Sequence, residues 1–212
     1  MKIRWHGHAC FEIGDGVTIV TDPHDGKSIG IKPPHTKADI VLISHNHFDH
    51  NHPKAVEGRK TNILNKEMDT TKNGVSIKSI KVYHDDSKGN KRGENLLFKF
   101  VVDGINLCHL GDLGHLLDEE VIRKLGKIDI VFVPVGNVFT IGPKEAWKVV
   151  SALSPNVAIP MHYRVGGLSL SIKPVEPFLQ DINENRVIRV GNEMDFEKED
   201  LPEELEIWVF TL

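Results

Sequence analysis

The feature that most constrains the fold of this chain is an apolar run that ends directly in a cluster of histidines. Residues 38–44 read ADIVLIS, which suits a strand buried on both faces, and residues 45–50 read HNHFDH. Three imidazoles and one carboxylate therefore stand where a buried strand emerges from its sheet. This arrangement predicts a chemical site at a strand end.

The spacing within the cluster indicates metal binding. In an extended strand exit, residues two apart project to the same side, so His45 and His47 can bind one ion together. Asp49 and His50 then turn elsewhere, as they would if a helix began there, and can face a second ion. Imidazole and carboxylate ligands suit zinc, manganese or iron better than calcium, which prefers oxygen ligands. The alternative is a solvated polar loop, which seldom places histidines at this spacing after a buried strand.

Three more potential ligands follow other predicted strands, in order along the chain. His84 ends SIKVYH, Asp112 follows INLCHLG, and His162 follows VAIPM. Taken singly, each has a structural alternative, namely a packed histidine or a turn aspartate. As a set of strand-end residues, they supply the further ligands that two ions need at one edge of a sheet.

The rest of the chain alternates short strands with helices. Residues 1–22 are expected to form short strands with a turn at Gly14-Asp15-Gly16, and residues 22–38 a loop. Further strands are expected at residues 75–83, 96–102, 105–110, 128–135, 157–161, 187–190 and 205–210, and helices at residues 118–125, 143–153 and 174–183. The class is therefore α/β. Because no linker or repeat interrupts the pattern, residues 1–212 are expected to form one domain.

Composition excludes several other classes. The formal net charge is -4 and the basic residues are dispersed, so a nucleic acid partner is not expected. No apolar run is long enough to span a bilayer and residues 1–20 do not resemble a signal peptide, so no membrane partner is expected. Two cysteines, Cys10 and Cys108, are consistent with core residues in a reducing, cytoplasmic compartment. Homo-oligomerisation is left open.

The motifs together resemble the metallo-β-lactamase superfamily. The resemblance consists of HxHxDH, an isolated histidine, a Gly-Asp step and a final histidine, and it spans essentially the whole chain. It implies a four-layer αββα sandwich with two adjacent metal ions at one edge. It also implies which residues bind them, with His45, His47 and His84 on the first ion, Asp49, His50 and His162 on the second, and Asp112 bridging both. Asp22 matches an aspartate that supports the ligands from behind.

Other segments narrow the resemblance to the compact UlaG-like metal-dependent hydrolases. They are Gly7-His8-Ala9, Tyr83-His84-Asp85, Arg92-Gly93-Glu94-Asn95, His109-Leu110-Gly111-Asp112, Pro134-Val135-Gly136 with Thr140, and Pro160-Met161-His162-Tyr163. On this match, Asn95 also supports the ligands from behind. The chain is much shorter than the ascorbate-phosphate lactonase branch, so that substrate is not carried over. It also lacks the long insertion that grips transfer RNA in the RNA-processing branch.

These residue types suit hydrolysis. A metal lowers the pKa of its bound water to about 7, so a hydroxide bridging two ions can attack a small ester, lactone or phosphodiester. The resemblance gives Asp49 a catalytic task as well, which is to orient the hydroxide and pass a proton to the leaving group. His47 stands where diiron oxygen-reducing relatives carry glutamate, which favours hydrolysis over redox chemistry. Cys108 is outside the bridging position, which argues against β-lactam hydrolysis.

The sequence therefore predicts a metal-dependent hydrolase of a small-molecule substrate. Its cofactors are expected to be two divalent ions, zinc first, with manganese, nickel or iron as alternatives. A phosphodiesterase or nuclease acting on short nucleic acid is the second hypothesis. A third is a metal-holding sensor without turnover.

The remaining histidines carry weaker predictions. His8 either contacts substrate or is a hydrogen-bonded structural residue. His109, three residues before Asp112, either orients ligands from behind or packs in the core. His115 is expected to approach the mouth of the site. Local hydrogen bonding or solvent exposure is expected for His6, His24, His35 and His52.

Overall fold

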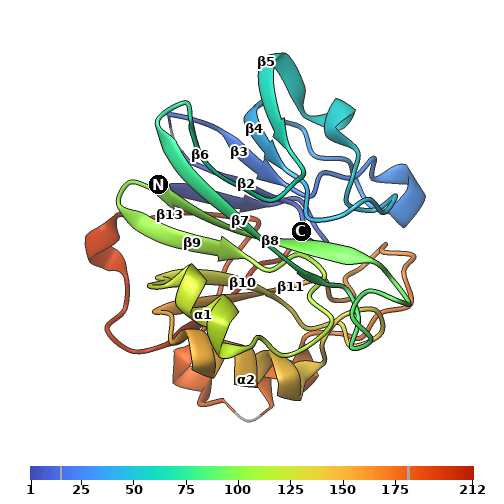
Figure 1. The fold of residues 1–212 in the computed structure, drawn as a ribbon. Helices are drawn as coiled ribbons and strands as arrows, with labels where there is room; N and C mark the ends of the chain where they lie inside the picture. The colour runs from blue at the N-terminus through green and yellow to red at the C-terminus, as the bar shows by residue number, and fades with distance from the viewer. Residues whose placement is uncertain (15, 181) are drawn as a thin grey trace.

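Two β-sheets and the helices against one of them make up the computed structural model, which describes residues 1–14, 16–180 and 182–212 (Figure 1). The six-stranded sheet has the order β13-β1-β2-β3-β4-β5. Its strands are β1 (Lys2–Trp5), β2 (Phe11–Ile13), β3 (Ile19–Thr21), β4 (Ala38–Leu42), β5 (Glu57–Leu64) and β13 (Glu193–Asp195). β4 pairs in parallel with both β3 and β5, and all but one of its residues are buried, as its apolar sequence predicts.

The eight-stranded sheet has the order β12-β14-β11-β10-β9-β8-β7-β6. Its strands are β6 (Met68–Lys72), β7 (Val75–Tyr83), β8 (Glu94–Val102), β9 (Ile105–His109), β10 (Ile130–Pro134), β11 (Val157–Met161), β12 (Val187–Arg189) and β14 (Glu206–Val209). The neighbours β9, β10, β11 and β14 are parallel, whereas β6 to β9 form an antiparallel meander. The carboxyl ends of β9, β10 and β11 therefore reach the same edge of this sheet.

Helices cover the outer side of the eight-stranded sheet, where Figure 1 shows α1 and α2. The α-helices are α1 (Glu119–Leu125), α2 (Pro143–Leu153) and α3 (Glu176–Leu179), and the 3-10 helices are η1 (Lys27–Ile29), η2 (Pro53–Ala55), η3 (Glu184–Arg186) and η4 (Lys198–Asp200). α2 buries its apolar stripe against β10. Over the six-stranded sheet, the outer layer is reduced to short segments, with Ala55 of η2 packing on a small cluster that includes Val41 and Val56.

The main hydrophobic core lies between the two sheets. It joins residues of the first sheet, such as Trp5 and Phe11, to residues of the second, such as Phe132 and Phe210. The Phe11 and Phe132 rings are 4.6 Å apart. The α/β sandwich predicted from the sequence is therefore confirmed.

Three strands were not predicted from the sequence, namely β5, β6 and β13. Each lies at the edge of its sheet and has largely exposed or half-buried side chains. Edge strands with polar and charged residues lack the apolar alternation by which a strand is recognised. The turn predicted at Gly14-Asp15-Gly16 includes Asp15, which is outside the described residues.

Two helix predictions need correction. The helix expected at residues 174–183, of which Asp181 is outside the described residues, is limited to α3, which begins at Glu176 and has Pro177 in its first turn, where no N–H is needed. The helix expected to begin near Asp49 is a single turn closed by a hydrogen bond from Asn51 N–H to His47 O. Pro53, which lacks an N–H, then starts the separate helix η2. α2 has the predicted bounds, and α1 lacks only Asp118, which caps it by accepting from Val121 N–H at 2.9 Å.

Candidate metal centre

Strand ends from both sheets bring the predicted ligands together. His45 follows β4 of the first sheet, while His84, Asp112 and His162 follow β7, β9 and β11 of the second. All four side chains are buried. The site therefore lies where the two sheets meet at one edge, as expected for side chains that leave buried strands.

The Asp112 carboxylate is the centre of this cluster. Its Oδ2 atom lies 3.1 Å from the Nε2 atom of His162, 3.3 Å from that of His84, 3.4 Å from that of His50 and 3.9 Å from that of His45. One carboxylate thus faces imidazoles from both predicted ligand sets. This is the place that a bridging ligand would occupy.

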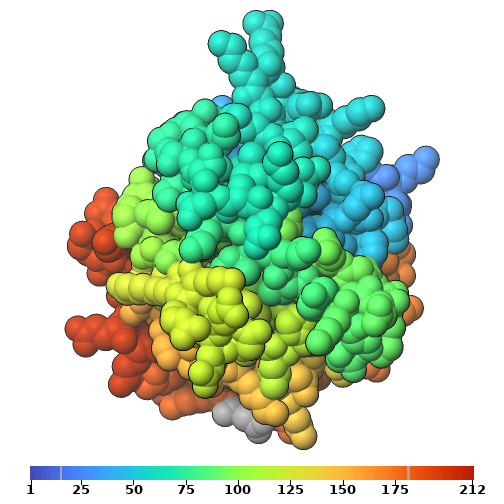
Figure 2. Space-filling model, viewed as in Figure 1, coloured from blue at the N-terminus to red at the C-terminus, as the bar shows by residue number. Residues whose placement is uncertain are grey.

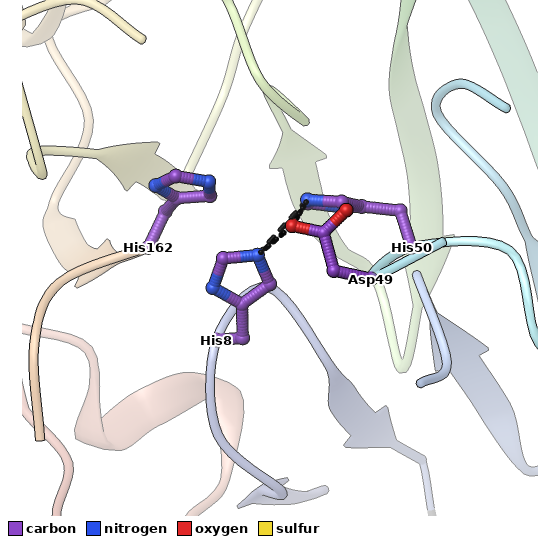
Figure 3. Close-up of side chains that lie close together, drawn as sticks. All are labelled: His8, Asp49, His50 and His162. Atoms are coloured by element: carbon purple, nitrogen blue, oxygen red, sulfur yellow. Dashed lines mark hydrogen bonds and ion pairs between the residues drawn. The ribbon is translucent and has the colours of Figure 1, made fainter. Parts of the chain in front are cut away.

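Potential ligand atoms form three close groups, of which Asp22, His45 and His50 make one that overlaps the other two. The other two groups correspond to the predicted ion sites. His45, His47 and His84 form the first group. The second group consists of His8, Asp49, His50 and His162, which converge from three segments of the chain in Figure 3. Within each group, the potential ligand atoms lie within 4.8 Å of one another. The structure thus brings together every ligand predicted from the sequence and adds His8 to the second group.

Unpaired polar atoms show that the site fits cations. Nε2 of His45 and Oδ1 of Asp112 are buried and have no hydrogen-bond partner in the described part of the chain. Buried polar atoms are normally paired, because an unpaired one costs about 1–3 kcal/mol. Both atoms are lone-pair donors of the kinds that zinc binds. A bound metal would therefore satisfy them.

The electrostatics of the site point the same way. Burial lowers the pKa of His45 to about 3, so this imidazole is neutral at neutral pH and its lone pair is available. Burial also lowers the pKa of His50, but the charges of Asp112 and Asp22 outweigh it and hold the pKa well above the usual value. The pocket between these two carboxylates thus favours positive charge.

Asp22 supports the ligands from behind. Its Oδ2 atom accepts from His50 Nδ1 at 3.0 Å and from the Ser44 hydroxyl at 2.6 Å, and its Oδ1 atom accepts from Ser44 N–H at 2.7 Å. Because Asp22 holds Nδ1 of His50, Nε2 is the atom of this ring that is directed at the candidate metal site. The Ser44 hydroxyl also lies 2.9 Å from Nδ1 of His45 and orients that ring in the same way. Sequence reasoning missed Ser44, although its place between the strand and His45 could have indicated it.

Asn95 and His109 support Asp112 through the backbone. Asn95 accepts from Asp112 N–H at 2.9 Å and donates to Leu110 O at 2.9 Å. His109 bonds with Ala9 O at 3.0 Å and accepts from Gly111 N–H at 3.2 Å. Both ring nitrogens of His109 therefore bond to the main chain, one to Gly111 next to Asp112 and the other to Ala9 in a distant segment.

Three of the eight non-glycine residues with positive φ in the described part of the chain lie at this site. His8, Asp22 and His162 have φ angles of 57°, 37° and 55°, in the left-handed region that non-glycine residues seldom adopt. Such strain is kept only where surrounding structure enforces it, and it gathers at functional sites. Gly136 contributes to this constraint, since a Cβ there would lie 2.1 Å from His162 O.

The other histidines lie outside the two groups. His115 was expected near the mouth of the site, but its ring nitrogens bond to the backbone, with Nε2 accepting from Tyr83 N–H at 3.1 Å. His115 therefore supports the end of β7. His6 bonds with Glu12, His24 bonds with the backbone of His6, and His35 is exposed, as expected.

A groove of about 550 Å³ opens beside the first group, with His45 and His47 in its wall. Its wall also contains the basic residues Lys66, Lys81 and Arg92 and the acidic residues Glu67 and Glu94, of which Glu94 pairs with Lys81 at 3.0 Å. A larger hollow of about 970 Å³ is lined by Arg4 and by the loop around Lys32, and none of the candidate ligands lines it. The smaller groove is the one that gives access to the metal centre.

Arg92 is held in a defined place in this groove. Both oxygens of Asp85 accept backbone N–H groups of the following loop, including that of Arg92 at 2.7 Å. The Arg92 guanidinium lies 4.5 Å from the centre of the Phe139 ring. It makes no ion pair with the other residues whose placement is described. The loop stands out as a green lobe on the surface in Figure 2.

Comparison with known proteins decides the family. The model of the β-lactamase superfamily domain matches residues 2–162, which is most of the chain. The chain belongs to this superfamily. Its matched region contains His8 and all seven of the predicted ligands, from His45 to His162.

Relatives within the superfamily are metal-dependent hydrolases. A UPF0173 metal-dependent hydrolase of Thermoplasma acidophilum is 31% identical over 187 residues, covering 77% of this chain and 83% of the relative. A protein of Thermotoga maritima, assigned to the Zn-dependent hydrolases of the metallo-β-lactamase superfamily, has a solved structure. It is 39% identical to this chain, with a TM-score of 0.82 and coverage of 99% of this chain and 97% of that one. These likenesses support an enzyme of the metal-dependent hydrolase class.

A more distant likeness concerns the fold alone. The metallo hydrolase Igni18 of Ignicoccus hospitalis is 20% identical, with a TM-score of 0.64 and coverage of 87% of this chain and 91% of that one.

Within the described residues, no helix has the length and apolar character needed to cross a membrane.

Proposed function

We propose that the protein is a dinuclear metal-dependent hydrolase that cleaves a small ester, lactone or phosphodiester. The observation that carries the proposal is the position of Asp112, whose Oδ2 atom lies within 3.9 Å of imidazoles from both ligand groups. His45, His47 and His84 would hold the first ion, Asp49, His50 and His162 the second, and Asp112 both. When bound, the ions supply an activated water and polarise the substrate oxygen under attack.

The protein's own residues prepare this chemistry. Ser44 and Asp22 hold Nδ1 of His45 and of His50, so that Nε2 of each ring is the atom directed at the proposed ions. Asp49 has a carboxylate at the wall of the site and is slightly exposed, at 9%. We assign it the catalytic role, in which one carboxylate oxygen orients the attacking water and then carries its proton to the leaving group.

Within the mixed-charge groove beside His45 and His47, Arg92 is the residue that favours a substrate with an anionic group. Arg92 is positioned there by Asp85 and Phe139, and guanidinium groups bind carboxylates and phosphates through paired N–H donors. An anionic ester or a phosphodiester fits this groove better than a neutral ester does.

Zinc is the proposed metal, because three histidines with a bridging carboxylate form a site that zinc prefers, and manganese, nickel or iron are the alternatives. One domain over residues 1–212 is proposed from the core that joins both sheets. Cys10 and Cys108 are free and buried, which is in keeping with the proposed cytoplasmic location.

A panel of substrates tests the proposal. Protein loaded with two equivalents of zinc or manganese is assayed on lactones, thioesters, phosphodiesters and short oligonucleotides, with and without a chelator. We expect turnover that a chelator and His47→Ala both abolish. Hydrolysis confined to oligonucleotides would favour the nuclease hypothesis. Tight metal binding without turnover on any substrate would contradict the enzyme and favour the sensor.

A further inference from the structure

His8 is the one hydrogen-bonding side chain that contacts Asp49 within the described structure. Its Nε2 atom lies 3.1 Å from Asp49 Oδ2, as the dashed line in Figure 3 shows. The ring is fully buried. Carboxylates that bind metals are themselves normally hydrogen-bonded, and this partner fixes their orientation. Asp22 is the hydrogen-bond partner that orients His50, and Ser44 is the partner that orients His45. His8 is the corresponding partner of Asp49.

We propose that His8 is a positioning residue, which donates from Nε2–H to Asp49 and keeps that carboxylate directed at the second ion and the attacking water. The inference rests on the proposed function. An ionised carboxylate only accepts hydrogen bonds, so the proton between the two groups belongs to His8. His8 Nδ1 is then unprotonated, in agreement with its lack of a hydrogen-bond partner among the residues described.

The alternative role of His8 is that of a further metal ligand, since Nε2 also lies 3.0 Å from Nε2 of His50. The number of ligands argues against it. With Asp49, His50, His162 and Asp112, the second ion already has four donors from the protein. Catalytic zinc keeps a position for water and seldom exceeds five ligands, so a fifth protein ligand would close the site.

The backbone holds His8 in the required place. His8 has a φ of 57°, and its carbonyl oxygen accepts from Trp5 Nε1–H and from His162 N–H, both at 3.1 Å. The rings of His8 and His162 are 4.2 Å apart. His8, which orients Asp49, is therefore hydrogen-bonded to the backbone of His162, a second proposed ligand of the same ion. This bond fixes the position of Asp49 relative to His162.

Three substitutions separate the roles of the side chain and the backbone. His8→Gln can place an amide N–H near the position of Nε2 but is a poor zinc ligand. His8→Asn tolerates the left-handed backbone better than glutamine does, but its amide is too short to reach Asp49. His8→Ala lacks both properties. Competition with a chromophoric chelator measures the affinity of each variant for its first and second zinc.

We expect His8→Asn and His8→Ala to weaken the second zinc by about 10- to 100-fold, with His8→Gln within about threefold of the wild type. The first zinc should be unaffected in all three variants. Equal losses in His8→Gln and His8→Ala would overturn the inference, because a ligand cannot be replaced by an amide. Binding in His8→Asn that equals or exceeds binding in His8→Gln would also overturn it, because backbone conformation would then be the cause.

Nitrogen NMR of the wild-type protein decides the inference separately from the proposed function. In zinc-loaded protein labelled with ¹⁵N-histidine, the His8 signals distinguish a protonated, an unprotonated and a metal-bound Nε2. A protonated Nε2 supports the positioning role, and either of the other states refutes it. The number of zinc ions bound by the wild type, together with its turnover, tests the proposed function instead.

Discussion

Asp22→Asn is expected to impair the second metal site without changing its ligands. In the wild type, Oδ1 of Asp22 accepts from the Ser44 N–H, and Oδ2 accepts from the Ser44 hydroxyl and from His50 Nδ1. An asparagine must keep its oxygen on the Ser44 N–H, because that donor cannot change. Its NH2 group then faces the Ser44 hydroxyl and His50.

His50 must respond by changing its tautomer. Two N–H donors cannot face each other, so the proton moves from Nδ1 to Nε2, the atom that binds the metal. To bind the metal, His50 must return its proton to Nδ1, where the asparagine no longer offers a charged acceptor. The hydrogen bond lost there is worth about 1.5–3 kcal/mol. At about 1.4 kcal/mol per tenfold change, the second zinc should bind about 10- to 100-fold more weakly.

Zinc competition titration measures this loss, and Ser44→Ala is the matched control. Ser44→Ala removes the hydroxyl from Nδ1 of His45 but leaves the contact between Asp22 and His50, so it should weaken mainly the first ion. A second zinc bound by Asp22→Asn within twofold of wild-type affinity would refute the tautomer argument.

Three further predictions concern stability and packing. Removal of both metals with EDTA should lower the melting temperature by about 20 °C, since each ion at 1,000 times its Kd contributes about 4 kcal/mol; an unchanged melting temperature would contradict metal binding. Gly136→Ala should cost about 1–3 kcal/mol and weaken zinc binding, because the added Cβ would lie 2.1 Å from His162 O, whereas Gly191→Ala enters open space and should do neither. Asp118→Ala should lower the free energy of unfolding by about 1 kcal/mol in urea, because α1 loses its cap, with metal affinity unchanged. Equal effects of the two glycine substitutions, or an Asp118→Ala variant as stable as the wild type, would show that these contacts contribute little.

Buried strands were predictable from the sequence, whereas edge strands were not. β4, β10 and β11 are paired on both sides, and their apolar runs reflect burial. β5 and β6 form sheet edges and carry polar residues that also suit a loop. Their pairing depends on the neighbouring strand, which local sequence does not contain.

One of the two helix errors has a local cause that could have been weighed more heavily. Pro53 closely follows the turn at Asp49, and it starts a separate helix because it has no N–H with which to continue the preceding one. The helix at residues 143–153 was predicted correctly because its proline occupies the first turn, where no N–H is needed.

The convergence of the candidate ligands could be predicted because strand order brings the strand ends to one edge, and the chemistry of these residues is visible in the residue type. The partners behind them depend on contacts between distant segments. His8 meets Asp49 across 41 residues, and His109 meets Ala9 across 100. Both histidines could be given two roles from the sequence, and only the three-dimensional contacts distinguish support of a ligand from packing.

The most direct test of the account is anomalous diffraction at the zinc absorption edge from crystals grown with excess zinc. Two peaks are expected, one on each side of Asp112, with ligand distances of about 2.0–2.2 Å to histidine nitrogens and carboxylate oxygens. A single peak, or His84, Asp112 and His162 directed away from His45 and Asp49, would contradict a dinuclear centre.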